Sequence, residues 1–317
     1  MTQIKKPLAI FGILAMSLAM FTACGESGSG GDERDADGPA MRTVEHAMGE
    51  TEVPEEPERV AALDNGATDA MLALGVEPAG VTTFTGTDFE SYEYVEEELR
   101  GVELLGQFVE PNLEAVANLG PDLIVASEGS HGEIYNELTQ VAPTVAMEDT
   151  NGDFREYVRN VGAVLAMEDE VEERVEEYER EAAEAAENLE GAVGDESVAF
   201  LRVTSEDYRL YGNDRLVGPI LYGDLGLEIP SLVEELAADE NYVEISLERV
   251  PDLDAEHLFV LDQTDDEMEE LTESPLWQSV PAVPQGNVYP AGRDTWIAVG
   301  LLASESMIED IEEALMD

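Results

Sequence analysis

The chain has 317 residues, of which 44% are hydrophobic, and carries a formal net charge of −58. Its length suits two domains of ordinary size, and its persistent apolar patterning excludes a disordered acidic chain. Nucleic-acid binding is excluded because phosphate contacts need clustered basic residues. So many carboxylates repel one another, and molar salt would screen this repulsion, so the charge indicates a protein adapted to salty surroundings.

Residues 1–23 have the pattern of a targeting segment. Two lysines near the start precede an apolar run, Leu8 to Phe21, which has the length of a signal-peptide core and is short for a membrane span. The run ends in Phe21-Thr22-Ala23-Cys24, which resembles the lipobox of bacterial lipoproteins and predicts lipidation of Cys24, the chain's single cysteine. The alternative is an ordinary signal peptide with a free cysteine. A single cysteine excludes intramolecular disulfides in either case.

Residues 24–41 are rich in Gly, Ser and acidic residues, and this composition predicts a flexible tether. The N-terminal lobe is expected over 42–152, where short apolar strands alternate with helical patterns, as in a parallel sheet covered by helices. Its first buried strand is predicted at Arg59 to Leu63. We expect Asp64-Asn65-Gly66 to form a turn and Thr68-Asp69 to cap the following helix.

Residues 153–191 are predicted to form an interlobe helical segment, dominated by one long helix from Glu168 to Glu190. Apolar residues recur every three or four positions and form one stripe, while Glu and Arg fill the other face. The stripe consists of Val171, Val175, Tyr178, Ala182, Ala185 and Leu189. Gly191 is the expected helix stop, because glycine tolerates a positive φ. A rigid strut between two lobes is favoured over a surface helix or a coiled coil, for which the stripe is too short.

The C-terminal lobe is expected over 192–317 and repeats the pattern of the first lobe. Strands are predicted at Ser197–Val203 and His257–Leu261, and helices at Leu216–Leu225 and Thr295–Met316. The order of elements therefore predicts an α/β fold with two Rossmann-like lobes, whose mostly parallel sheets are joined by a single long α-helix.

One short motif occurs in both predicted lobes. Asn112-Leu113-Glu114 and Ser246-Leu247-Glu248 each open a short helix ahead of a buried strand. A carboxylate in the first turn of a helix stabilises that helix through its dipole by about 0.3–1 kcal/mol. This local effect is by itself a sufficient reason for either glutamate.

Together these segments resemble the substrate-binding lipoproteins of iron–siderophore ABC transporters, from about Thr43 to Leu315. Besides the two glutamate motifs, the resemblance rests on Ala73-Leu74-Gly75-Val76, Gly120-Pro121-Asp122-Leu123-Ile124, Ala142-Pro143-Thr144-Val145, Gly223-Asp224-Leu225-Gly226-Leu227 and Gly286-Asn287-Val288-Tyr289. It implies capture of a ferric siderophore between the lobes, without a cofactor, and delivery to an ABC permease dimer with its ATPase. It further implies an extracytoplasmic monomer, lipid-anchored to the cell membrane at Cys24, that docks onto the permease through Glu114 and Glu248.

The resemblance also implies ligand contacts in the C-terminal lobe. Arg202, inside an apolar strand, matches a ligand-binding arginine of the family, and a guanidinium supplies fixed donors for carboxylate or catecholate oxygens. Tyr211 and Trp296 match aromatic cleft positions. The alternatives are an ion pair with a nearby acid for Arg202 and core packing for the two aromatic residues.

Two family positions fall in the N-terminal half of the cleft. His131 follows a predicted strand end, where open α/β sheets bind ligands, and Gln107 occupies another cleft-facing position. Family members often carry a basic residue immediately before the His131 position, but this chain has Ser130 there. The departure makes this half of the cleft less basic and argues against a strongly anionic, carboxylate-rich siderophore.

Other function classes fit the sequence less well. An enzyme is not expected, since the chain has neither an HExxH zinc motif nor a glycine-rich phosphate loop after a strand, and its one cysteine is assigned to lipidation. Direct binding of a metal ion relies on clustered His and acidic residues, and His46, His131 and His257 are the only histidines. Cobalamin or haem, bound by the same architecture, is the open alternative to a siderophore.

Overall fold

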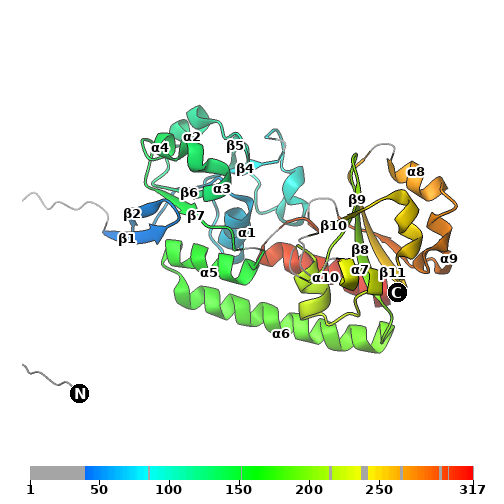
Figure 1. The fold of residues 1–317 in the computed structure, drawn as a ribbon. Coiled ribbons are helices and arrows are strands. Elements are labelled where there is room, and N and C mark those ends of the chain that lie inside the picture. Colours follow the sequence, from blue (N-terminus) through cyan, green and yellow to red (C-terminus); the bar gives the residue numbers. More distant parts are fainter. Residues whose placement is uncertain are drawn as a thin grey trace, which may run out of the picture. The chain divides into compact units, whose positions relative to one another are not determined.

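The computed structural model describes residues 40–84, 86–150, 152–213, 216–236, 242–264, 267–292, 295–298 and 300–316. These residues contain a β-hairpin and two five-stranded sheets, each accompanied by helices (Figure 1). The predicted signal segment, Cys24 and nearly all of the predicted tether lie outside the described residues. Within the described ranges, no helix is both long and apolar enough to cross a bilayer.

The N-terminal lobe holds the hairpin and a parallel sheet in the order β5-β4-β3-β6-β7. Its strands are β1 (Met41–His46), β2 (Gly49–Pro54), β3 (Val60–Ala62), β4 (Gly80–Thr83), β5 (Glu103–Gln107), β6 (Leu123–Ser127) and β7 (Thr144–Met147). All neighbouring strands of the sheet run parallel, as the alternation of strands and helices predicts. The chain fills one side of β3 with β4 and β5 and then crosses to β6 on the other side, so the topological switch point lies between β3 and β6.

The first helix of this lobe begins earlier than predicted. Helical segments of the lobe are α1 (Asn65–Ala73), η1 (Glu90–Val95), α2 (Leu113–Leu119), α3 (Glu128–His131), η2 (Gly132–Ile134), α4 (Tyr135–Leu138) and α5 (Phe154–Leu165). The Asp64 carboxylate accepts from the Ala67 N–H at 3.1 Å and caps α1, so the predicted turn at this position is wrong. Thr68 and Asp69 are buried inside the helix instead of capping it.

The C-terminal lobe holds a mixed sheet in the order β10-β9-β8-β11-β12. Its strands are β8 (Val198–Val203), β9 (Tyr208–Leu210), β10 (Val243–Ile245), β11 (His257–Asp262) and β12 (Val288–Pro290). Strands β8, β11 and β12 are parallel, whereas β9 runs antiparallel to both of its neighbours. The predicted mostly parallel character therefore holds fully in the first lobe and over three strands of the second.

Two predicted helices of the C-terminal lobe differ from the structure. The helical segments here are η3 (Pro219–Asp224), α7 (Ser231–Leu236), η4 (Leu247–Asp252), α8 (Glu267–Glu273), η5 (Trp277–Ser279), α9 (Ala282–Gln285) and α10 (Leu301–Met316). Leu216 has a positive φ of 52°, and the helix that follows is a short π-helix, η3. The terminal helix begins at Leu301 and not at Thr295, because residues 295–297 form a turn.

The long helix α6 (Glu168–Val193) has 26 residues and is about 39 Å long. The whole predicted apolar stripe is buried, and Val193 extends it by one turn. Gly191 therefore lies inside the helix, and the positive φ of 57° occurs at Gly194, where the helix ends. The predicted end was wrong because one more buried apolar residue stabilises a further turn.

A second helix, α10, also joins the two lobes, and the sequence analysis did not predict this. It packs against both α6 and α1, and it is drawn in red in Figure 1. The N–H groups of Leu302 and Ala303 donate to the Asp69 carboxylate at 3.1 and 3.0 Å. Because the first N–H groups of a helix have no partner within it, a residue of α1 completes the hydrogen bonding of α10. One apolar core includes residues of α1, α6, α10 and β8, so the lobes share their packing.

Candidate ligand-binding site

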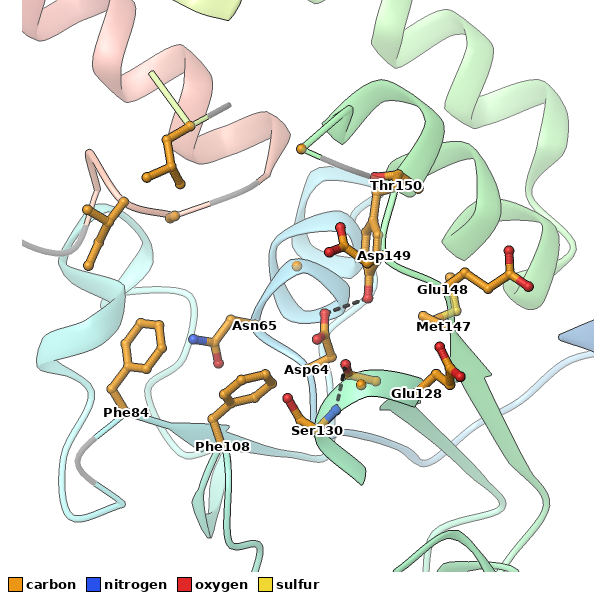
Figure 2. A pocket seen from close by; sticks show the side chains of 18 residues that line it. Asp64, Asn65, Phe84, Phe108, Glu128, Ser130, Met147, Glu148, Asp149 and Thr150 are labelled. Atoms are coloured by element: carbon orange, nitrogen blue, oxygen red, sulfur yellow. Dashed lines mark hydrogen bonds between the residues drawn. The ribbon is translucent and has the colours of Figure 1, made fainter. Parts of the chain in front are cut away.

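A cavity of about 400 Å³ lies where the strands of the N-terminal sheet end. Every strand of this sheet contributes a residue at or just after its carboxyl end, namely Asp64 after β3, Phe84 after β4, Phe108 after β5, Ser127 on β6 and Met147 on β7. Figure 2 shows the side chains that surround the cavity. The C-terminal lobe contributes Leu216, Ile297 and Ala298. Open α/β sheets bind ligands at the carboxyl ends of their strands, and this cavity occupies that place.

Two tyrosines fix the polar floor of the cavity. The Tyr157 hydroxyl donates to Asp64 Oδ1, and the Tyr92 hydroxyl donates to Asn65 Oδ1 at 2.8 Å. Burial raises the pKa of the Asp64 carboxyl, and the hydrogen bond from Tyr157 opposes this effect. Burial, together with the charge of Asp64, raises the pKa of Tyr157 well above its ordinary value. Tyr157 therefore remains protonated at neutral pH and keeps donating to Asp64.

An aromatic pair forms one wall of the cavity. The Phe84 and Phe108 rings meet edge to face with centroids 6.2 Å apart, and Phe84 is 46% exposed. His131 supports Phe108 from behind: its Nδ1 accepts from the Ser127 N–H at 2.9 Å, which leaves the proton on Nε2, and Nε2 donates to the Phe108 carbonyl at 2.6 Å. The structure therefore places His131, which is only 1% exposed, behind the wall and not at its surface. Gln107 is exposed at the end of β5, beside Phe108.

Carboxylates border the same cavity. Ser127 of β6 lies opposite Met147 of β7, so Glu128 and Glu148, which follow these two residues, belong to neighbouring strand ends (Figure 2). Both glutamates are exposed and line the cavity, as does Asp149. Among the described residues that line the cavity there is no Arg or Lys. The N-terminal wall thus offers aromatic faces and carboxylate oxygens.

The predicted arginine lies on β8 in the C-terminal lobe. Arg202 Nε donates to Gln263 Oε1 at 2.5 Å, and its Nη1 donates to the Tyr211 hydroxyl at 3.2 Å. Both of these partners are neutral, whereas neighbouring Arg209 forms an ion pair with Asp207 at 2.7 Å. The structure therefore brings Arg202 and Tyr211 together, and the hydrogen bonds of Arg202 go to uncharged groups.

The two predicted aromatic residues of this lobe lie in its core. Tyr211 is 2% exposed and Trp296 is fully buried. The Trp296 ring packs against Phe259 and Phe200, with centroids 4.7 and 5.5 Å apart, and its Nε1 donates to Asp310 at 2.8 Å. The structure gives both residues the core packing that was the alternative to ligand contact.

With the geometry described, comparison with known proteins decides the family. The family model for periplasmic binding proteins matches residues 60–295, a range that includes both five-stranded sheets and most of the residues that line the cavity. The chain belongs to this family. Similar solved structures confirm the predicted α/β fold with two lobes.

Relatives of this periplasmic binding protein match it along nearly its whole length. The probable siderophore-binding lipoprotein YfiY of Bacillus subtilis is 30% identical over 97% of this chain and 98% of its own. The iron(3+)-hydroxamate-binding protein FhuD of the same organism is 28% identical over 99% of both chains. The structure of Staphylococcus aureus SirA complexed with staphyloferrin B is similar with a TM-score of 0.74 at 30% identity, covering 87% of this chain and 98% of SirA.

Both glutamate motifs of this periplasmic binding protein open helices, as predicted. The Asn112 side chain accepts from the N–H groups of Glu114 and Ala115, both at 3.1 Å. Glu114 in α2 and Glu248 in η4 are exposed in the first helical turn. Hydrogen bonds from the Glu248 backbone N–H and from Ser246 lower the pKa of the Glu248 carboxyl. Both side chains therefore lie on the surface, each at the start of a helix.

The sequence analysis missed most of the residues that line the cavity. Phe84, Phe108, Glu128 and Glu148 carry no motif, and each comes immediately after a strand. Their position was the available signal, because the first residues after parallel strands meet at one edge of the sheet. The sequence analysis applied that rule to His131 alone, which lies four residues beyond the end of β6.

Proposed function

We propose that this periplasmic binding protein is an extracytoplasmic lipoprotein that captures a ferric siderophore and delivers it to an ABC permease dimer with its ATPase. The observation that carries the proposal is the cavity at the strand ends of the N-terminal sheet, in a chain of this family. The names of YfiY and FhuD, for siderophore binding and for iron–hydroxamate binding, support it, since both relatives match over their full length.

Arg202 is proposed to bind oxygen atoms of the ferric complex. A guanidinium has five N–H donors, and the two hydrogen bonds to Gln263 and Tyr211 orient it without neutralising its charge. In this proposal Tyr211 positions Arg202 from the core, and His131 positions Phe108. Ligand contact by Gln107 and Trp296 stays a prediction.

Delivery is proposed to use one carboxylate on each lobe. Glu114 and Glu248 are exposed at helix starts of the two lobes, and we propose that they pair with basic residues of the two permease subunits.

Residues 1–23 are proposed to be the signal peptide and Cys24 the lipidated residue that anchors the protein to the cell membrane. Adaptation to high salt is likewise a proposal, supported by the net charge of −58.

The proposal includes no resident metal and no catalysis. Over the described ranges, no group of three or more His, Cys, Asp or Glu side chains is arranged to hold a metal ion. Iron would enter only as part of the ligand. Cobalamin or haem in the same cavity is the alternative ligand class, and the names of the relatives favour the siderophore.

An equilibrium titration tests the proposed function. Purified protein in high salt is mixed with ferric siderophores of several classes, with cobalamin and with haem, and the fluorescence of Trp277 and Trp296 is followed. Both indoles are buried in the C-terminal lobe, so unbound ligand has little access to them by collision, and quenching that saturates reports binding. Saturable quenching by a ferric siderophore is the expected result. Quenching by cobalamin or haem alone would contradict it.

A further inference from the structure

The cavity also carries information on the charge of its ligand, an inference that rests on the proposed function. The N-terminal lobe faces the cavity with the rings of Phe84 and Phe108, the thioether of Met147, the carboxylates at the ends of β6 and β7, and neutral polar side chains such as Asn65 and Thr150. The neutral polar groups can donate a hydrogen bond, but no described lining side chain from this lobe carries a positive charge to offset a ligand carboxylate. The rings and the carboxylates suit a ligand surface that is apolar or positively charged.

The two glutamates are placed to act on a ligand. Glu128 and Glu148 are exposed, they follow paired residues of neighbouring strands, and both line the same cavity as the aromatic pair. A carboxylate-rich ferric complex would bring like charges together here, and the described lining offers no Arg or Lys to offset them. An ammonium group, in contrast, would gain from the carboxylates and from the aromatic faces together.

The C-terminal lobe differs in charge. Its Arg202, which is not among the described residues that line the cavity, makes its hydrogen bonds with the neutral groups of Gln263 and Tyr211. Its positive charge suits the iron-coordinating oxygens of a ferric complex, while the N-terminal wall suits a cationic appendage. A ligand with both features would place its oxygen-rich centre and its amine toward different lobes.

We propose that the ligand is a neutral or cationic ferric complex of the hydroxamate type that carries a protonated amine, and that Glu128 and Glu148, with Phe84 and Phe108, select for this amine. The SirA structure holds staphyloferrin B and FhuD is named for iron(3+)-hydroxamate, so similarity to relatives does not choose between ligands. The residues that line the cavity favour the neutral or cationic complex over an anionic one.

A matched set of ligands tests the proposal. The probes are ferrioxamine B, which has a terminal ammonium group, its N-acetylated form, which lacks that charge, and ferric dicitrate, which is anionic. Affinities are measured by titration in one buffer, at the lowest salt concentration that keeps the protein folded, because molar salt would screen an exposed ion pair. We expect ferrioxamine B to bind about fivefold more tightly than its N-acetylated form, from an exposed ion pair plus a cation–π contact, and ferric dicitrate to bind most weakly.

A double variant tests whether the two glutamates cause the preference for the ammonium group. Glu128→Gln with Glu148→Gln is expected to reduce the preference for the ammonium form to less than about twofold, because it removes the attracting charges. The control, Glu133→Gln with Glu137→Gln, removes two exposed carboxylates of the same lobe that do not line the cavity, and it is expected to keep the preference. Loss of the preference in the control as well would assign the effect to overall charge and overturn the proposal.

Failure of this proposal is distinguishable from failure of the proposed function. Equal affinities for the two ferrioxamines, or tighter binding of ferric dicitrate, would overturn the charge preference and leave siderophore binding intact. No saturable binding of any of the three complexes would contradict both.

Discussion

The two lobes share an architecture, but they present different surfaces to the ligand. In the N-terminal lobe, five parallel strands end at one edge, and each contributes a residue to the cavity. In the C-terminal lobe, β9 runs antiparallel to both of its neighbours, and the predicted aromatic contacts Tyr211 and Trp296 are core residues. The comparison teaches that a repeated fold can place its binding groups asymmetrically, because strand direction decides which residues reach the shared edge.

The largest expected effect concerns the exposed glutamate that each lobe carries at the start of a helix. Glu114→Ala with Glu248→Ala is expected to reduce siderophore uptake by cells to background, while the affinity of the purified protein stays within about twofold, because both carboxylates are exposed at helix starts. The control is Glu137→Ala with Glu270→Ala, which also removes one exposed helical carboxylate from each lobe. Normal uptake by the first variant would remove the docking role.

The next effect tests the proposed ligand contact of the C-terminal lobe. Arg202→Ala is expected to weaken binding of the ferric siderophore by about 10- to 100-fold, the range for a lost hydrogen bond to a charged group, and to leave the unfolding transition in place. Arg249→Ala, which removes an exposed arginine that pairs with Asp252 in the same lobe, is the control in the same titration. Unchanged affinity of the Arg202 variant would make Arg202 a structural strand residue.

A third prediction tests whether the lobes share one folding unit. Asp69→Ala leaves the N–H groups of Leu302 and Ala303 without their carboxylate acceptor. The free energy of unfolding is expected to fall by about 1–3 kcal/mol, as measured by chemical denaturation at fixed salt. Asp69→Asn keeps one acceptor oxygen and is expected to lose less. A variant as stable as the wild type would show that α10 does not depend on α1.

The smallest expected effect concerns the N-terminal aromatic wall. Phe108→Ala is expected to weaken siderophore binding by about fivefold, the worth of one aromatic contact. Val109→Ala is the matched control, because Val109 is the next residue, is 70% exposed and does not line the cavity. If the two variants bind equally well, Phe108 does not contact the ligand, and the proposed contrast between the lobes is weakened.

The periodic features of this fold were predictable, and its long-range features were not. The apolar stripe of α6 and the alternation of strands and helices are local patterns, and the structure confirms them. Asp69 was misread as a helix cap for its own helix because its partners, Leu302 and Ala303, lie more than 230 positions away. Gly191 was misread as a stop because the buried contact of Val193 outweighs the helix cost of one glycine.

The position of the candidate binding site was predictable from the sequence, but only some of its residues were. The rule that ligands bind at the carboxyl ends of parallel strands fits the observed cavity. Which side chains line it depends on packing: His131 turns inward because both ring nitrogens find backbone partners, at Ser127 and Phe108. Trp296 turns inward because its ring fits between Phe200 and Phe259. Tertiary contacts decide the direction in which these side chains point, and such contacts leave no pattern in the sequence.

Hydrogen exchange of the backbone amides, with and without the ferric siderophore that binds most tightly, tests the central claim most directly. Ligand in the cavity is expected to slow exchange at the strand ends around Phe84, Phe108, 127–131 and 147–150. A second, more open groove of about 870 Å³ is lined by residues that include Tyr94, Tyr289 and Asp310. Slowed exchange around that groove, with no change at the strand ends, would contradict the account.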